Sequence, residues 1–103
     1  MAPQPILNTA KRFIKAARQY GIPVEAGYLF GSWVQGRGTE WSAIDLAIIS
    51  SAFEGVKFSD RRKLDTALLE VDTDIHIHPY RPQDFDESNP FVREIFNTGI
   101  RIV

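Results

Sequence analysis

The sequence predicts an α/β domain: a small mixed β-sheet of three or four strands with helices packed on it, in the order αβαβαβα. Apolar residues recur at helical spacing over 5–20 and again over 64–71. Three further segments, 24–30, 43–49 and 72–78, are typical of strands, and the last two alternate with a period of two. Helical and extended segments therefore follow one another along the chain, as they do in domains that combine helices with a sheet.

The chain length of 103 residues predicts one domain, spanning 1–103. The net charge of −1 gives no overall field that would attract a nucleic acid polymer. No apolar run approaches the ~18 residues of a membrane span, so we expect no membrane partner. Since the chain has no cysteine and its N-terminus lacks the layout of a signal peptide, we expect a cytoplasmic protein.

Proline and glycine mark the boundaries in the first part of the chain. Pro5 suits a first helical position, and Gly21-Ile22-Pro23 ends the first helix. The strand over 24–30 then leads directly into Gly31-Ser32. A glycine here lets the backbone turn sharply and lets a ligand approach closely, and the serine offers a hydroxyl and an N–H to a phosphate.

The second half of the chain has boundary signals of its own. Ser59 is expected to cap the next helix, and Pro79 is expected to end the third strand. Asn89 and Pro90 pair a cap residue with a first-turn proline, and they begin a last helix with an apolar face. The tail over 100–103 is apolar enough to be a short strand or a docking segment.

Asp45 is a carboxylate within the otherwise apolar strand over 43–49. By alternation it shares a face of that strand with Ala43, Ala47 and Ile49. A charge in such a place is unfavourable unless it is paired, bound to a metal or at the strand's open end. Asp45 is therefore the first candidate for a functional carboxylate.

Gly31-Ser32, ten further residues and then Ala43-Ile44-Asp45 resemble the Gly-Ser-x10-Asp-x-Asp signature of the minimal nucleotidyltransferases, in the DNA polymerase beta superfamily. The resemblance extends over residues 25–103 and implies the polymerase beta-like fold and an enzyme that transfers AMP from ATP. The sequence departs from the signature at Ala43, which stands where the first aspartate is expected. A substitution made to trap substrate and a natural loss both account for this change.

In this family, as the resemblance implies, paired aspartates hold two Mg²⁺ ions that bridge the triphosphate and activate an acceptor hydroxyl. The implied metal ligands and catalytic residues in this chain are Asp45 and, on the neighbouring strand, Asp74. Ala43 occupies the third catalytic position but has no side-chain oxygen. We therefore expect transfer to be lost or strongly weakened.

The phosphates of the nucleotide are expected at the turn. The resemblance implies that Gly31 and Ser32 hold the β- and γ-phosphates, and Arg37 is the only cation in the polar segment that follows. Trp33 and Trp41 in the same segment have two interpretations. They either stack on a nucleobase or a partner, or cover the edges of the core.

The choice of Asp74 depends on the register of the third strand. By alternation Asp72, Asp74, His76 and His78 share one face of this strand. A register two residues later places His76 where the third carboxylate is expected, and Asp72 is then a strand-end residue. Asp74, His76 and His78 together also form a possible ligand set for a transition metal.

Small members of this family resemble the antitoxin half of bacterial and archaeal HEPN toxin pairs. There the nucleotidyltransferase attaches AMP to a tyrosine of its HEPN ribonuclease partner and so silences it. We expect the acceptor to be such a separate protein, in a hetero-oligomer with this chain. Two alternatives stay open: an antitoxin that inhibits by binding alone, which a natural Ala43 favours, and a nucleotidyltransferase that modifies a small molecule as a homodimer.

Overall fold

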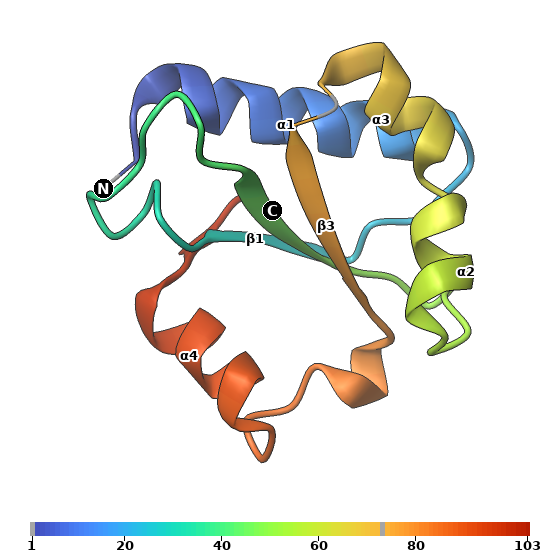
Figure 1. Cartoon of the computed structure of the whole chain (residues 1–103). Coiled ribbons are helices and arrows are strands. Elements are labelled where there is room, and N and C mark those ends of the chain that lie inside the picture. The colour runs from blue at the N-terminus through green and yellow to red at the C-terminus, as the bar shows by residue number, and fades with distance from the viewer. Residues whose placement is uncertain (1, 73) are drawn as a thin grey trace.

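The computed structural model describes residues 2–72 and 74–103, so Met1 and Thr73, the latter inside the strand predicted over 72–78, lie outside the described residues. At the centre is a four-stranded mixed sheet in the order β3-β2-β1-β4 (Figure 1). Its strands are β1 (Ala26–Phe30), β2 (Ile44–Ile49), β3 (Ile75–Tyr80) and β4 (Ile100–Arg101). β1 is antiparallel to both of its neighbours, whereas β2 and β3 are parallel. The predicted small mixed sheet is confirmed, and the C-terminal tail supplies its fourth strand.

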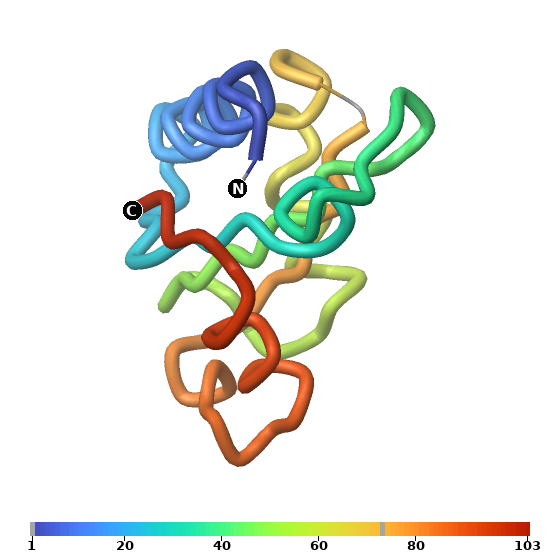
Figure 2. Tube along the Cα trace, turned by 90° about the vertical axis from the view of Figure 1, so that its left-hand side faces the viewer, coloured from blue at the N-terminus to red at the C-terminus, as the bar shows by residue number. Residues whose placement is uncertain are grey.

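Helices lie on both faces of this sheet. They are α1 (Gln4–Gln19), α2 (Lys57–Arg62), α3 (Asp65–Val71) and α4 (Pro90–Thr98), with a short 3₁₀ turn, η1 (Pro82–Asp84). Figures 1 and 2 show α1 and α3 on one side of the sheet and α4 on the other. The predicted α/β architecture is therefore confirmed, with a two-sided covering of helices.

Alternating residues of the strands contribute to two separate hydrophobic cores, one on each face of the sheet. The core under α1 and α3 includes Phe13, Ile14, Leu29, Leu46, Ile48 and Ile77. The smaller core under α4 includes Tyr28, Ala47, Ile49, Tyr80, Val92 and Ile95. Because side chains alternate between faces, Asp45, His76 and His78 belong to the face that α4 covers. The functional candidates thus share a face with the smaller core.

The strand register determines which polar side chains become neighbours. Phe30 at the end of β1 lies opposite Asp45, and in the parallel ladder Asp45 lies opposite His76. Two residues further along, Ala47 lies opposite His78. The two imidazoles of β3 therefore lie beside the one carboxylate of β2.

The helix that follows the second strand differs from its prediction. It begins at Lys57, two residues before Ser59, and its N-cap is Val56, which makes no side-chain cap bond. The predicted Ser59 cap is therefore wrong. The helical stretch also divides at residues 63–64 into α2 and α3.

Asp60 organises this region in place of a serine cap. Its side chain is buried and accepts hydrogen bonds from the backbone N–H groups of Glu54 (2.8 Å) and Gly55 (2.9 Å). Lys63 donates to the same carboxylate at 3.3 Å. Burial raises the pKa of Asp60, but these bonds outweigh it and hold the pKa below its ordinary value of 3.8. The carboxylate therefore anchors the loop before α2 onto the helix.

The third strand continues through Pro79 to Tyr80, so the predicted strand end at Pro79 is wrong. Hydrogen bonds from Ile44 N to the Asp74 carbonyl and from Ser50 N to the Tyr80 carbonyl, both 3.0 Å, direct the even-numbered backbone groups of β3 toward β2. The nitrogen of Pro79 consequently faces the free edge of the sheet. A proline is compatible with an edge strand at such a position, because no ladder bond is lost there.

Candidate functional site

Gly31 brings the end of β1 against the carboxylate of Asp45. Its φ of +84° lies in the left-handed region, which favours glycine. A Cβ at this position would overlap Oδ2 of Asp45, so glycine is required for the close approach as well as for the backbone angle. The Gly31 carbonyl then accepts hydrogen bonds from the N–H groups of Val34 and Gln35, both at 3.1 Å. The chain therefore turns sharply beside the carboxylate.

A cavity of about 500 Å³ opens at this turn, and its lining includes Gly31, Ser32, Arg37, Asp45 and Phe91. The three residues expected to hold phosphates and the carboxylate of β2 thus border one hollow. Arg37 is exposed, and its guanidinium donates to the side-chain oxygen of Gln35. A hydroxyl, a cation and backbone donors next to a carboxylate form a lining suited to a phosphorylated ligand.

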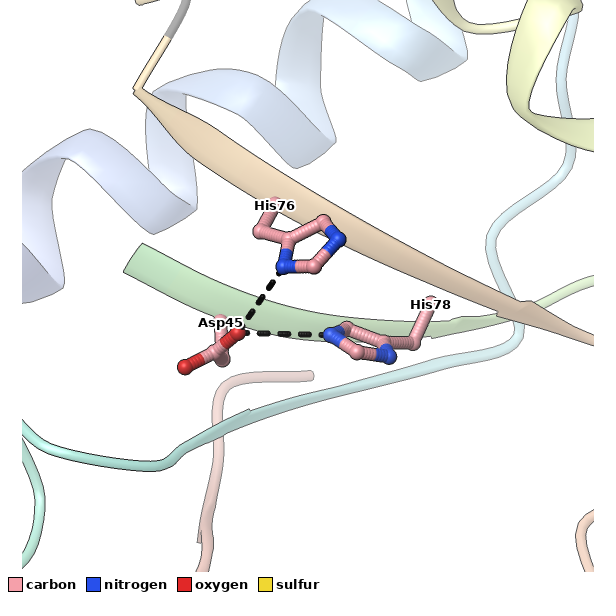
Figure 3. A group of neighbouring side chains, drawn as sticks. All are labelled: Asp45, His76 and His78. Carbon is pink, nitrogen blue, oxygen red and sulfur yellow. Dashed lines mark hydrogen bonds and ion pairs between the residues drawn. The ribbon is translucent and has the colours of Figure 1, made fainter. Parts of the chain in front are cut away.

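Asp45, His76 and His78 form a compact group of three possible metal ligands (Figure 3). One carboxylate oxygen of Asp45, Oδ1, lies 3.4 Å from His76 Nδ1 and 3.3 Å from His78 Nε2. The side chains of Asp45 and His78 are 24% and 19% exposed, whereas that of His76 is 55% exposed. The group is therefore half-buried, with an open side toward solvent.

Asp74 lies apart from this group. It is exposed and directly precedes β3, where its backbone N–H donates to the Asp72 side chain at 2.8 Å. Asp74 lines a second cavity, of about 470 Å³, together with Trp41, Ala43 and His76. The position of the missing carboxylate and Asp74 therefore border a common hollow, but the role of Asp74 as a metal ligand stays a prediction.

The two tryptophans differ in their surroundings. Trp33 packs against the larger core and donates from Nε1 to the Ser42 carbonyl at 3.4 Å. A Cβ at Gly38 would overlap its ring, so the loop closes tightly over it. Trp41 is 88% exposed at the rim of the second cavity. Trp33 thus covers a core edge, and only Trp41 remains available to a nucleobase or a partner.

Aromatic residues that the sequence did not indicate as part of the site surround His78. The ring centroid of His78 lies 4.9 Å from that of Phe30 and 5.9 Å from that of Phe91. Phe91 was expected only as part of the apolar face of the last helix. The pattern of the sequence contained no signal that α4 would pass over the imidazoles, since this depends on how the helix packs.

The family follows from comparison with known proteins. The family model "Polymerase beta, Nucleotidyltransferase" matches residues 11–103.

The chain belongs to the polymerase beta nucleotidyltransferase family.

A solved structure, that of a protein from Sulfolobus solfataricus provisionally described as a nucleotidyltransferase, has the same fold. The two chains are 15% identical, with a TM-score of 0.68 over 94% of this chain and 78% of the other. Comparison with curated proteins finds no significant match. No described helix of this nucleotidyltransferase domain is long and apolar enough to cross a membrane.

Polymerase beta-type nucleotidyltransferases generally use Mg²⁺ and a nucleotide. The described side chains around Asp45 do not fit a pair of magnesium ions. Ala43 provides no oxygen, and the residue opposite Asp45 in β3 is His76, whose ligand atom is a nitrogen. A two-magnesium centre needs several hard oxygen ligands in near-octahedral geometry, and Asp45 is the one carboxylate in the described ligand group.

Proposed function

We propose that this chain is a nucleotidyltransferase-type antitoxin. It binds ATP at the turn formed by Gly31 and Ser32 and associates with a HEPN-family ribonuclease toxin. Its family reaction would attach AMP to a tyrosine of that toxin and neutralise it. In this chain the transfer itself is lost or strongly weakened.

One observation carries the nucleotide-binding part of the proposal. The cavity that Gly31, Ser32 and Arg37 line also reaches Asp45, so phosphate-binding groups and a carboxylate meet in one hollow. Its volume of about 500 Å³ is within the range of small-molecule sites. The rim carries exposed aromatic side chains, Phe91 on one side and Trp41 at the neighbouring cavity, which suit burial under a partner protein.

The family reaction transfers the AMP group of ATP to the tyrosine oxygen and releases pyrophosphate. The tyrosine oxygen would bond to the α-phosphorus of ATP, the bond from that phosphorus to the bridging oxygen would break, and pyrophosphate would leave with the electron pair. The tyrosine proton must pass to a base. Ala43 stands at the position from which a carboxylate would assist this step; it lines the second cavity and has no group that accepts a proton.

The absence of a carboxylate at Ala43 favours a second candidate, an antitoxin that inhibits its partner by contact alone. Ala43 occupies one of the acidic positions expected from the family, and the residue opposite Asp45 in β3 is His76 rather than the expected Asp74. A natural loss of the carboxylate at position 43 would account for an antitoxin of this kind. In this form the domain would retain its folded surface and lose only the transfer.

The test compares this chain with Ala43→Asp and with the double variant Ala43→Asp/His76→Asp. Each is incubated with ATP labelled at the α-phosphate, Mg²⁺ and a candidate HEPN toxin, and label on the toxin is measured. We expect no label with the unmodified chain, and at least a tenfold gain with the double variant. Ala43→Asn is the matched control, because it has nearly the same shape without the charge.

Label transfer by the double variant, absent with Ala43→Asn and with a Tyr→Phe toxin, supports the transferase origin. If no variant transfers label but all bind the toxin and protect RNA from it, the contact inhibitor is supported instead. If none of the proteins binds the toxin, the antitoxin proposal fails.

A further inference from the structure

We propose that Asp45, His76 and His78 bind a single transition-metal ion of the Zn²⁺ class, in place of the magnesium pair of the family. The site combines one carboxylate oxygen with two imidazole nitrogens, and all three ligand atoms lie within 4.8 Å of one another. This inference goes beyond the proposed function and does not depend on a nucleotide or on a partner protein.

The spacing of the ligand atoms supports a shared ion. Charge-assisted N–H···O bonds are typically about 2.7–2.9 Å long. The distances from Asp45 Oδ1 to His76 Nδ1 (3.4 Å) and to His78 Nε2 (3.3 Å) are longer than this. Zn²⁺ lies about 2.0–2.2 Å from nitrogen and oxygen ligands, which makes the edge of its tetrahedron about 3.4 Å. These two distances therefore match the separation of ligand atoms around a tetrahedrally coordinated Zn²⁺ ion.

The chemistry of the donors selects the class of metal. Imidazole nitrogens suit zinc, cobalt, nickel, copper and iron, whereas Mg²⁺ prefers oxygen ligands and gives up its bound water reluctantly. An octahedron around Mg²⁺ also has shorter edges, of about 3.0 Å. One carboxylate and two imidazoles are thus a poor magnesium site and an ordinary zinc or iron ligand set.

Packing holds the ligands in place before any ion binds. The His78 ring packs against the rings of Phe30 and Phe91, and its centroid lies 4.7 Å from that of His76. Asp45 is held against Gly31, where no side chain separates the carboxylate from the turn. Because β2 and β3 are paired across this point, the three ligands come from a rigid part of the sheet.

Room for a further ligand exists beside the group. The cavity at the turn includes Asp45 in its lining, and the second cavity includes His76. A water molecule or an oxygen of a bound molecule can therefore complete the coordination from solvent. Three protein ligands with an open position are typical of zinc sites that bind a small molecule.

The experiment titrates the metal-free protein with Zn²⁺ and, separately, with Mg²⁺ by calorimetry. Because His76 and His78 are the two histidines of the whole chain, their imidazole NMR signals report the site directly. We expect one Zn²⁺ per chain, at least 100-fold tighter binding than Mg²⁺, and a shift of both imidazole signals. Co²⁺ should give the visible absorption of a four-coordinate ion.

Variants then locate the ion. His76→Asn and His78→Asn should each weaken Zn²⁺ binding by more than the 10–100-fold typical of losing an outer-sphere partner. Asp65→Asn, an exposed carboxylate of α3 on the opposite face of the sheet, is the matched control and should not change it. Circular dichroism confirms that each variant is folded. Equal affinity for Zn²⁺ and Mg²⁺, unmoved imidazole signals, or a loss of binding in Asp74→Asn but not in His76→Asn would overturn the proposal.

Discussion

Gly31 is the residue on which the contact between the turn and the carboxylate depends. It combines a left-handed backbone with a space that the Asp45 side chain already occupies. These two demands can be separated experimentally, because Gly36 also has a positive φ, +75°, but has nothing near the position of a Cβ.

We predict that Gly31→Ala destabilises the fold by more than Gly36→Ala. Gly36→Ala, the matched variant, should lower the free energy of unfolding by about 1–2 kcal/mol, the cost of placing a residue with a side chain in the left-handed region. Gly31→Ala should lower the free energy of unfolding by more than this, because the new methyl group also displaces Asp45. Urea denaturation of both variants measures the difference. Equal losses would show that the contact between residues 31 and 45 is not tight.

At the scale of elements, the loop before α2 depends on one buried carboxylate. Asp60 is 1% exposed and accepts two backbone hydrogen bonds and one from Lys63. Its pKa is lowered in the folded chain, so ionised Asp60 stabilises the fold above the unfolded value of about 3.8. This contribution is lost as the pH falls through the lowered folded pKa.

We predict that Asp60→Asn destabilises the protein by about 1–3 kcal/mol at pH 7. The difference from the unmodified chain should shrink as the pH is lowered below about 3.8. Asp65→Asn, at an exposed position in the first turn of α3, should change stability by less than about 0.5 kcal/mol. Thermal unfolding at pH 7, 5 and 3 tests this. A difference that stays constant with pH would contradict the role of the charge.

The elements also show where reasoning from the sequence succeeds and where it stops. Local patterns suffice to predict the first and last helices, the strands of the sheet and the Gly31 turn, because spacing and turn chemistry act within a few residues. They do not predict the division of the middle helix into α2 and α3. The prediction that Pro79 ends the third strand was wrong for a non-local reason. Whether Pro79 is tolerated depends on β3 being an edge strand with that nitrogen turned outward, which is a property of the sheet.

The same limit applies to the candidate site. Alternation placed Asp45 on one face of its strand and both histidines on one face of theirs, which the structure confirms. Because α2 and α3 lie between β2 and β3 along the chain, no tight turn fixes the offset between these two strands. That offset places His76, and not Asp74, opposite Asp45. Alternation alone cannot distinguish registers that differ by two residues, because both keep the same side chains on the same face.

At the scale of the whole molecule, the linings of both cavities include residues at the edge of the sheet where β1 ends and β2 and β3 begin. Trp41 lies at the second of these cavities and is almost fully exposed, at 88%. A large aromatic side chain in this place is typical of a residue that a partner protein buries. The net charge of −1 adds little long-range attraction, so affinity for the proposed partner would have to come from contact area.

If the proposed HEPN toxin is the partner, we predict that Trp41→Ala weakens that complex at least tenfold, about 1.4 kcal/mol, and leaves the stability of the free domain nearly unchanged. Leu69→Ala is the control, because Leu69 is also exposed but lies on α3. Calorimetric titration of the toxin with each variant measures the effect. Similar affinities for both variants would place the partner elsewhere on the surface.

The proline within β3 has a consequence for how the molecule meets other extended chains. An outermost strand normally offers a row of unpaired N–H and C=O groups on which a foreign strand can assemble. In β3 that row is only six residues long and lacks the donor of Pro79. A regular intermolecular ladder would be interrupted at Pro79, which disfavours strand-to-strand association along this edge.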